Sequence, residues 1–538
     1  MKPFARRRRA LALDAAVCIF VSSATLLAAP SAASSPPVRD HAAPSTPDGP
    51  AVLGAAVAGS AVPSAAVEVA DPHPVEERLD LTRARLAAYQ AHGQALPDWA
   101  RPLPTSAVPT LGAPPQAPVR NLQTGEGFET LDAAVAAASA GDTLRIHADM
   151  LDQSQIVLDK DLVLEGATGS EVLRAAEDTG TSGDDRAWFL VAPGVEVHVR
   201  DLVFDGSGRL IYQAFRQRGS GSFARVEFRA IEFEPAGPSF AGFAVVAFGD
   251  GPVDVLDSSF SDIGRVGVLY FGTGVAGSLA AGNRYVGKGD GPFLDYALEA
   301  NGGAVVAWWN NTATDCRGLV PLDSSQAAGL LVTTFSGAGT TALVHENDLT
   351  DNAIGLAVGF GDSDTATVEA AFNRLVGNVV SGLRNESTVA LDGERNWWGC
   401  NGGPGAPGCD AIDGDGTVDA EPWLVLTAQA LGEPLCFGEV TRLVADLTRD
   451  STGASTAFDG RVPAGIPATF TQGVLGTVAP LATSFDAGWA TTGYTAGGVP
   501  GLETIDVTVD AETLPLTFEI GNTVFCDGFE SGDLSAWS

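Results

Sequence analysis

The sequence predicts an all-β protein whose largest domain is a parallel β-helix. Five segments headed by an asparagine superimpose, at Asn283, Asn310, Asn347, Asn373 and Asn396. The steps between them, 27, 37, 26 and 23 residues, exceed any helical or hairpin period and indicate a solenoid. Each repeat holds several short apolar runs, and Gly or Asn separates them without an intervening helical pattern. Such strands, stacked coil on coil, form a parallel β-helix.

Residues 1–33 are typical of a secretory signal peptide. Lys2 and the run 6–9 are basic, an apolar stretch covers 10–29, and small residues at 31–33 suit cleavage. The alternative is an uncleaved membrane anchor, because the stretch approaches the length of a bilayer span. We expect a secreted or surface-exposed protein with no stable membrane span after cleavage.

The chain is strongly acidic, with a formal net charge of −35. Cleavage after residue 33 removes five positive charges and one negative charge, which leaves about −39. Such a surface repels nucleic acid and anionic lipid, so neither is expected as a partner. It also repels polyuronates unless cations bridge the two.

Residues 34–118 are rich in Ala and Pro and predict a disordered spacer. Within the spacer, 75–91 predicts a short helix with a loose apolar stripe. That stripe consists of Leu79, Leu81, Leu86 and Tyr89.

The folded body is predicted to start near Val119 with a capping helix. Leu131, Ala134, Val135 and Ala138 have the spacing of one helical face, and Gly141 ends the helix. A short amphipathic helix suits the open end of a solenoid, because it covers the first coil.

The asparagine column sets a register of eight rungs. The residue two positions after each asparagine is taken as inward, and Phe204, Phe233 and Phe260 extend this column backward. Positions five and seven before it also point inward, because residues two apart on a strand share a face. Positions six and four before it then point outward. Eight rungs span roughly 40 Å, and the whole helix is expected to have about ten coils.

The repeat region resembles secreted bacterial right-handed β-helix proteins of the pectin-lyase-like fold. The resemblance rests on FETLDAAVAAASAGDTLRI, on PbH1-type segments such as NDLTDNAIGLAV, and on NWWGCNGGPG, and it covers 119–426 with PWLVL closing it. It implies the right-handed sense. Residues 427–522 predict antiparallel strands and resemble a bacterial Ig-like (invasin-type) β-sandwich. Residues 523–538 resemble a C-terminal signature of exported proteins.

The β-helix family includes pectate lyases, polygalacturonases and pectin methylesterases, whose catalytic segments are absent here. One outward cluster remains, predicted to stack on a single face: His198, Arg200, Glu227, Arg229 and Asp254. It has the acid, base and arginines that elimination or hydrolysis of an acidic sugar needs. The alternative is a solvated face whose opposite charges pair between rungs.

Further along this face, Trp308 and His345 are predicted to be outward and to bind a ligand, with Trp308 stacking on a sugar ring. The alternative is that a loop covers them. The longest step places an insertion in 315–340, and insertions in solenoids are often on the binding side.

Two further sites concern metal and sulfur. Asp413, Asp415 and Asp419 suggest a calcium loop, although the ligand pattern is incomplete, and a simple turn is the alternative.

Among the cysteines of an exported protein, Cys400 and Cys409 form the best disulfide pair, and Cys436 with Cys526 a second. Cys316 is then unpaired. Trp397 and Trp398 are expected to close the end of the core.

These observations favour a monomeric, adhesin-like protein that binds a polysaccharide or a cell-surface partner and needs no cofactor, calcium aside. A polysaccharide lyase or glycoside hydrolase is the first alternative, and a passive surface spacer is the second. Because the family's catalytic segments are missing, the sequence leaves enzyme activity undecided and favours binding.

Overall fold

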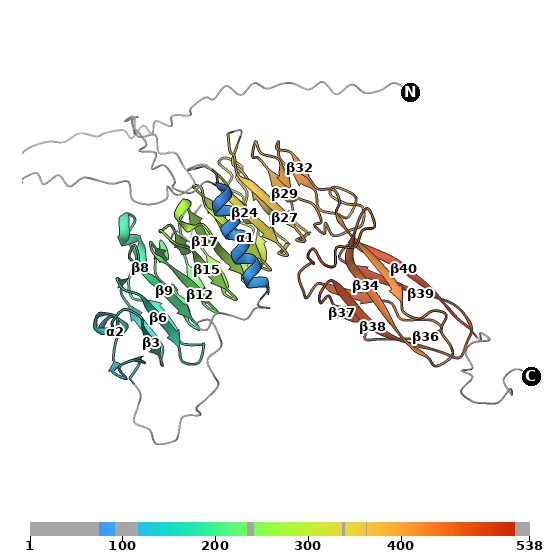
Figure 1. Ribbon diagram of the computed structural model, residues 1–538, viewed down its shortest axis with the longest axis horizontal. Coiled ribbons are helices and arrows are strands. Elements are labelled where there is room, and N and C mark those ends of the chain that lie inside the picture. The colour runs from blue at the N-terminus through green and yellow to red at the C-terminus, as the bar shows by residue number, and fades with distance from the viewer. Residues whose placement is uncertain (1–74, 92–116, 234–240, 336–338, 362, 522–538) are drawn as a thin grey trace, which may run out of the picture. The chain divides into compact units, whose positions relative to one another are not determined.

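A computed structural model describes residues 75–91, 117–233, 241–335, 339–361 and 363–521 (Figure 1). The predicted signal peptide, the C-terminal signature at 523–538 and most of the spacer lie outside these residues. The chain is almost entirely β, with a right-handed parallel β-helix followed by a β-sandwich, as predicted. No helix among the described residues has the length and apolar character to cross a membrane.

Each complete coil of the β-helix contributes one strand to each of three sheets, which we call A, B and C; an antiparallel pair before the first coil also joins sheet A, and the last coil gives no strand to sheet B. Sheet A has the order β2 (Gly127–Phe128), β1 (Val119–Asn121), β3 (Asp142–Ile146), β6 (Leu162–Gly166), β9 (Glu196–Arg200), β12 (Ser220–Ala224), β15 (Val253–Leu256), β18 (Ser278–Ala281), β21 (Val305–Trp309), β24 (Thr341–His345), β27 (Thr367–Ala371), β30 (Leu391–Asp392) and β32 (Val418–Asp419). Sheet B contains β4 (Met150–Gln153), β7 (Val172–Ala175), β10 (Val203–Asp205), β13 (Glu227–Ile231), β16 (Ser259–Ile263), β19 (Arg284–Gly289), β22 (Thr312–Cys316), β25 (Asp348–Thr350) and β28 (Arg374–Val376). Sheet C contains β5 (Ile156–Leu158), β8 (Ala187–Val191), β11 (Gln213–Gln217), β14 (Phe243–Ala247), β17 (Val266–Phe271), β20 (Tyr296–Asn301), β23 (Ala328–Val332), β26 (Ile354–Val358), β29 (Ser381–Asn385) and β31 (Ile412–Asp413).

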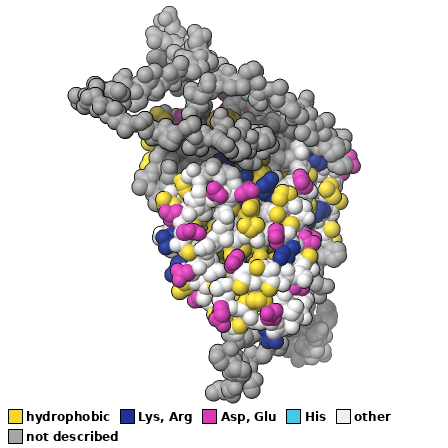
Figure 2. Space-filling model, turned by 90° about the vertical axis from the view of Figure 1, so that its left-hand side faces the viewer, with side chains coloured by type: hydrophobic (Ala, Val, Ile, Leu, Met, Phe, Trp, Pro, Cys, Tyr) yellow, Lys and Arg dark blue, Asp and Glu magenta, His cyan; other side chains and the backbone are white. Residues whose placement is uncertain are grey.

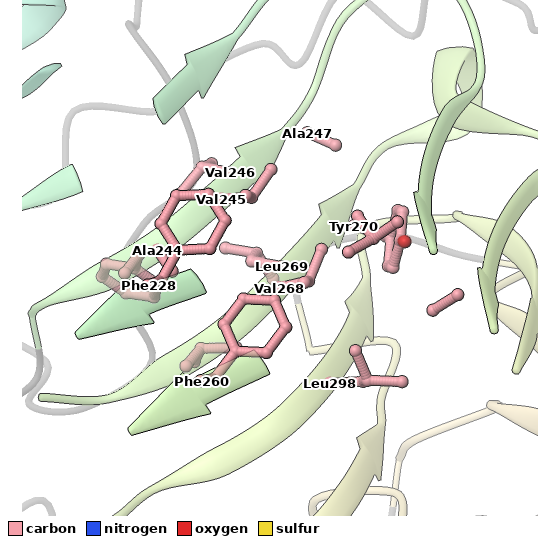
Figure 3. Packing of buried hydrophobic residues seen from close by; sticks show 14 of the residues in the cluster. Phe228, Ala244, Val245, Val246, Ala247, Phe260, Val268, Leu269, Tyr270 and Leu298 are labelled. Atoms are coloured by element: carbon pink, nitrogen blue, oxygen red, sulfur yellow. The ribbon is translucent and has the colours of Figure 1, made fainter. Parts of the chain in front are cut away.

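The core fills the space between the three sheets with stacked side chains of the same kind (Figure 3). Phe228 stacks on Phe204 with ring centroids 5.3 Å apart, and on Phe260 at 5.4 Å. These are matching positions on successive strands of sheet B. Coils that repeat the same inward residue therefore stabilise one another by close aromatic contact.

Sheet B also corrects the predicted register. Phe204 pairs with Phe228 rather than with Phe233, so the rung assigned to Phe233 was displaced by five residues. Both residues are Phe in similar surroundings, and the sequence offered no means of choosing between them. As a result Glu227 and Arg229 lie in sheet B, not in sheet A.

The corner between sheets A and B carries the predicted asparagine ladder, in which one residue differs from the prediction. Asn283, Asn311, Asn347, Asn373 and Asn396 form the ladder, and the prediction that Asn310 belongs to it was wrong. Each side-chain oxygen of the last four accepts a hydrogen bond at 2.9 Å from the amide side chain of the coil before it.

The ladder asparagines do not themselves take the left-handed backbone expected of them. The residue immediately before each has a positive φ: Gly282, Asn310, Glu346, Phe372 and Arg395. This left-handed residue makes the corner, and the asparagine after it turns inward and is buried. A second ladder, not predicted, links Asn352, Asn378 and Asp410 at the corner between sheets B and C.

Two helices cover parts of the β-helix. Helix α2 (Leu131–Ala137) is the predicted cap, and Thr130 accepts a hydrogen bond from the backbone N–H of Ala133 at its start. Helix α1 (Val75–Ala91) has the predicted bounds and packs on the outer face of sheet A, against β18 and β21 (Figure 1). Short 3₁₀ turns occur at Gly183–Arg186 and Thr273–Val275.

Two antiparallel four-stranded sheets form the C-terminal sandwich. The first has the order β33 (Leu424–Ala430), β34 (Val440–Asp450), β38 (Trp489–Ala496) and β36 (Gly476–Ala479). The second has the order β37 (Ala482–Ser484), β35 (Pro467–Phe470), β39 (Gly501–Val509) and β40 (Glu512–Ile520). Because β33 starts at Leu424, residues 424–426 belong to the sandwich rather than closing the β-helix.

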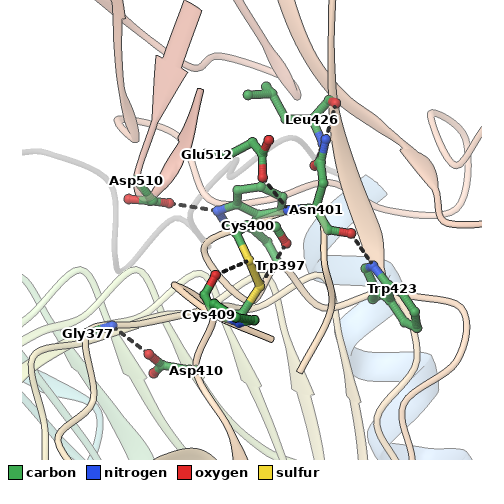
Figure 4. The surroundings of a disulfide bond; sticks show 11 residues. Gly377, Trp397, Cys400, Asn401, Cys409, Asp410, Trp423, Leu426, Asp510 and Glu512 are labelled. Atoms are coloured by element: carbon green, nitrogen blue, oxygen red, sulfur yellow. Dashed lines mark hydrogen bonds between the residues drawn. A yellow bond between two sulfur atoms is a disulfide. The ribbon is translucent and has the colours of Figure 1, made fainter. Parts of the chain in front are cut away.

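The two tryptophans at the end of the β-helix are structural, as expected. Trp398 completes the core of the β-helix, whereas Trp397 belongs to the sandwich core. The indole N–H of Trp397 donates to Asp510 at 2.7 Å (Figure 4). Arg374 also binds Asp510, and it binds Asp348 at 3.0 Å.

Candidate functional site

The outer face of sheet A carries the first group of predicted site residues. The carboxylate of Glu165 is fully buried and is bound by Arg145 at 2.6 Å and by the Nε of Arg200 at 2.9 Å. His198 shares a hydrogen bond of 2.7 Å with Ser222. Burial lowers the pKa of His198, and Arg200 adds to this effect. Arg200 is therefore held by a buried partner rather than poised for a substrate.

Glu227 and Arg229 lie on a different face, which corrects the prediction of one five-residue cluster. Arg229 bridges Glu227 and Asp205 at 3.1 Å each, and Arg174 binds the same carboxylate of Asp205 at 3.1 Å. Burial acts against ionisation of Asp205, but hydrogen bonds from Ser207 and both arginines bring its pKa down to about 2. The pattern is a ladder of opposite charges between coils, which was the alternative interpretation.

Asp254 faces outward on sheet A, but helix α1 reaches it. Arg85 donates to Asp254 at 2.7 Å, and the backbone N–H of Leu279 donates to it at 3.1 Å. Burial raises the pKa of Asp254, although Arg85 opposes the rise. His198, Arg200 and Asp254 thus share the outer face of sheet A, as predicted, with Ser222 between His198 and Asp254, whereas Glu227 and Arg229 lie in sheet B.

Trp308 and His345 do not form the predicted pair. Because the prediction placed Asn310 rather than Asn311 in the ladder, it reversed the two faces of β21. In the structure Trp308 points into the core and is fully buried. Trp309 takes the outward position beside His345. His345 approaches Glu369 at 3.2 Å, and Arg83 of α1 approaches the same carboxylate at 3.0 Å. The close approach of His345, aided by Arg83, outweighs burial and lowers the pKa of Glu369 to about 2.

The predicted insertion leads to an exposed aromatic pair. Phe335 follows β23 and Phe360 follows β26, one coil further on, with 54% and 56% of their surfaces exposed. Their ring centroids lie 5.5 Å apart, with the ring planes nearly perpendicular. Large apolar side chains exposed together on a soluble protein often mark a binding site.

A buried carboxylate fixes the two turns that present these rings. Asp364 is 4% exposed and accepts hydrogen bonds from the hydroxyls of Thr333 at 2.6 Å and Thr334 at 2.7 Å. It also accepts from the backbone N–H of Phe360 at 3.1 Å. The backbones that carry Phe335 and Phe360 therefore share one anchor, and the pair is held in position before any ligand binds.

The aspartates proposed for calcium are spread over two sheets. Asp413 lies in β31 of sheet C and accepts from Arg384 at 2.9 Å, whereas Asp419 lies in β32 of sheet A. Asp415 lies between them on an exposed turn. Across the described ranges, no group of three or more His, Cys, Asp or Glu side chains is placed to hold a metal ion.

The cysteines follow the predicted pairing where the structure describes them. Cys400 and Cys409 form a disulfide with Cα atoms 5.1 Å apart (Figure 4), and Cys316 is free and buried. Cys436 is also disulfide-bonded, while its predicted partner Cys526 lies outside the described residues. Next to the first bridge, Asn401 donates to the carbonyl of Leu426 at 2.9 Å and fixes the start of the sandwich.

Glu299 on β20 and Asp295 just before that strand are buried acids, and no motif in the sequence marks them. Burial raises the pKa of Glu299 to about 7 and that of Asp295 to about 6. The guanidinium of Arg265 lies 4.9 Å from the ring centroid of Tyr296, which is on the same strand as Glu299. Both acids sit inside the fold, so they concern stability rather than an accessible site.

Comparison with known proteins gives a structural likeness and no sequence family. No protein-family model matches the chain, and neither does any curated protein sequence. A solved structure of a mutant of the periplasmic alginate epimerase AlgG is similar over 55% of this chain and 78% of its own. The TM-score is 0.32 and the sequence identity is 10%, so this likeness carries no information on activity.

Proposed function

We propose that the protein is a polysaccharide-binding protein, and that Phe335 and Phe360 form its contact with the sugar chain. The exposed, pre-positioned aromatic pair is the observation that supports this proposal. Aromatic rings stack against the apolar faces of pyranose rings, and two rings on successive coils can follow a chain. Binding is favoured over catalysis because the charged candidates are held in structural ion pairs.

The charge of the protein points to a neutral polysaccharide. The formal net charge is −35, and Figure 2 shows acidic side chains scattered over the face it presents rather than gathered in one patch. An acidic polymer would meet repulsion from most approaches, whereas a neutral one would not. Consistent with this role, we interpret the chain as an exported bacterial protein, its coils as PbH1-type repeats and its sandwich as Ig-like.

Retention on immobilised glycans tests the proposal. We expect the purified protein to bind at least one neutral polysaccharide and to release neither unsaturated products nor new reducing ends. The double variant Phe335→Ala, Phe360→Ala should bind at least tenfold more weakly. Phe458→Ala is the matched control, because Phe458 is fully exposed in the sandwich and should leave binding unchanged. Equal binding by the double variant, or product release, would refute the proposal.

A further inference from the structure

The outer face of sheet A has an apolar strip that α1 covers. Two neighbouring outward columns run along the stacked strands, and their apolar members are Ala224, Leu256, Leu279, Ala281, Ala307, Trp309 and Leu343. Charged residues bound the strip: Asp254 on β15 at one end, and Glu369 on β27 at the other. The strip is thus an apolar surface with a carboxylate at each end.

Helix α1 matches this surface in shape and charge. Its Arg78, Thr82 and Leu86 are buried, and Leu79 and Tyr89 pack beside them. Tyr89 meets the ring of Trp309 edge-on, with centroids 5.8 Å apart. Arg85 binds Asp254 at 2.7 Å and Arg83 binds Glu369 at 3.0 Å. Each carboxylate at the ends of the strip therefore receives an arginine from the helix.

The helix depends on this contact for its own structure. It has 17 residues with few apolar side chains, and Leu81, counted in the predicted stripe, is 49% exposed. An isolated helix of this length is marginal in water, so docking and helix formation are coupled. Its attachment combines apolar contacts with two ion pairs and with hydrogen bonds from Thr82 to the carbonyl of Val305 and from Arg85 to the carbonyl of Gly277. The ion pair of Arg83 with Glu369 is the exposed part of this contact, with side chains 50% and 36% exposed.

We propose that the strip is a helix-docking site that α1 occupies reversibly, and that it accepts α1 from a second copy of this chain. Residues 92–118 join α1 to β1, and a chain of 27 residues spans at most about 90 Å. This reach allows the helix to dock on a neighbouring molecule with the same contacts. The exchange is independent of the sugar site, and it would link two aromatic pairs into one bivalent binder.

Intramolecular docking dominates in dilute solution. Covalent attachment through residues 92–118 gives the helix an effective concentration on the order of millimolar, so exchange needs either a comparable protein concentration or a cut in this connection. Salt weakens the ion pairs of Arg83 and Arg85, because exposed charges are screened. Release should therefore rise with ionic strength.

The decisive experiment cuts the tether. A protease site is placed within residues 92–116, the full chain is cleaved, and a fluorescent peptide of residues 75–91 is added. We expect the peptide to enter and to displace the native helix, with at least tenfold weaker binding at 0.5 M than at 0.02 M salt. A peptide with Arg83→Ala and Arg85→Ala should bind at least tenfold more weakly, whereas one with Gln90→Ala should match the parent. Failure of the peptide to enter a folded, cleaved protein overturns the proposal.

A second measurement decides the matter if the cleaved protein unfolds. Two differently tagged full-length copies are mixed near 1 mM and chemically cross-linked before dilution, and each tag is then captured. We expect the tags to co-purify in the parent and the yield to fall at least fivefold with Leu86→Ala, which removes a buried contact of the helix. Tags that never co-purify, or that do so equally with Leu86→Ala, contradict helix exchange.

Discussion

Charged side chains in this protein are mostly paired, and the few buried acids without a full set of partners stand out. Glu299 is 3% exposed and Asp295 is fully buried. Asn301 approaches Glu299 only at 3.5 Å, and one oxygen of Asp295 has no hydrogen-bond partner among the residues that the structure describes. Burial disfavours their charged forms, so both take up protons more readily in the folded chain than in the unfolded one.

This difference predicts a pH dependence of stability. Because the folded pKa of Glu299, about 7, lies above its unfolded value, its contribution is present below about pH 4.5 and is lost as the pH rises through 7. Between pH 8 and pH 5 it should add up to about 3 kcal/mol to the free energy of unfolding. In Glu299→Gln this part of the gain should be absent from denaturant titrations, while the smaller contribution of Asp295, whose pKa is raised to about 6, remains.

The variant isolates Glu299 from other groups that titrate in the same window. His147 and His198 have lowered pKa values, so they act in the opposite sense as the pH falls. They are present in both proteins and cancel in the difference. Glu129→Gln, at an exposed position, should behave like the parent. A difference between Glu299→Gln and the parent that does not change with pH would contradict the assignment.

The carboxylate of Asp510 connects the sandwich to the end of the β-helix. It accepts from Trp397 and Arg374, and its side chain is 5% exposed. We expect Asp510→Asn to lower the free energy of unfolding of the sandwich by about 3 kcal/mol, because it leaves a buried arginine without its full charge partner. Urea unfolding followed by tryptophan fluorescence measures this. Asp506→Asn on exposed β39 surface is the control, and equal midpoints for both variants would argue against the role.

At the scale of the element, the asparagine ladder is a continuous chain of hydrogen bonds across coils. Asn347 is fully buried and donates to Asn373 at 2.9 Å and to the carbonyl of Trp308 at 3.0 Å. Asn347→Ala leaves several buried backbone groups unpaired, and we expect a loss of about 3 kcal/mol in thermal or urea unfolding.

Asn310→Gly is the matched comparison for the ladder. Asn310 has a φ of 54° and supplies the left-handed residue at the corner, a role that glycine fills without steric cost. We expect its stability to stay within about 0.5 kcal/mol of the parent. A loss of stability in Asn310→Gly as large as that in Asn347→Ala would contradict the assignment of Asn311, rather than Asn310, to the ladder.

The neighbouring residues Asn310 and Asn311 show how much of the fold could be predicted from the sequence. The spacing of the asparagines and the alternating apolar residues predicted the β-helix and its capping helix, because both patterns follow from burial on one face. The adjacent Asn310 and Asn311 are equivalent to such a pattern, and choosing the wrong one turned Trp308 outward. A slip of one residue reverses every side chain of a strand.

The docking of α1 was beyond prediction for a different reason. The helix itself was predicted from Val75 to Ala91 and has those bounds. Its target, however, is separated from it by a tether and by more than a hundred residues, as the pairing of Arg85 with Asp254 illustrates. Contacts that distant leave no local period, so charge complementarity between α1 and sheet A could be recognised only in three dimensions.

For the molecule as a whole, net charge and local ion pairs respond to salt in opposite directions. A charge of −35 makes the folded chain repel itself, and screening relieves that repulsion. The buried pairs, such as Arg200 with Glu165, are shielded from salt because the carboxylate is fully buried. We therefore expect the main thermal transition of the intact protein to rise by several degrees between 0.02 M and 0.5 M NaCl, measured by far-UV circular dichroism.

The exposed pair of Arg83 with Glu369 should weaken over the same range, so protease cleavage within 75–91 should become faster while the β-helix becomes more stable. Sodium sulfate at equal ionic strength is compared with NaCl to separate screening from effects of ion type. A transition that falls with NaCl would mean that ion pairs outweigh self-repulsion in this fold, and protection of α1 that does not change with salt would mean that its apolar contacts alone hold it in place.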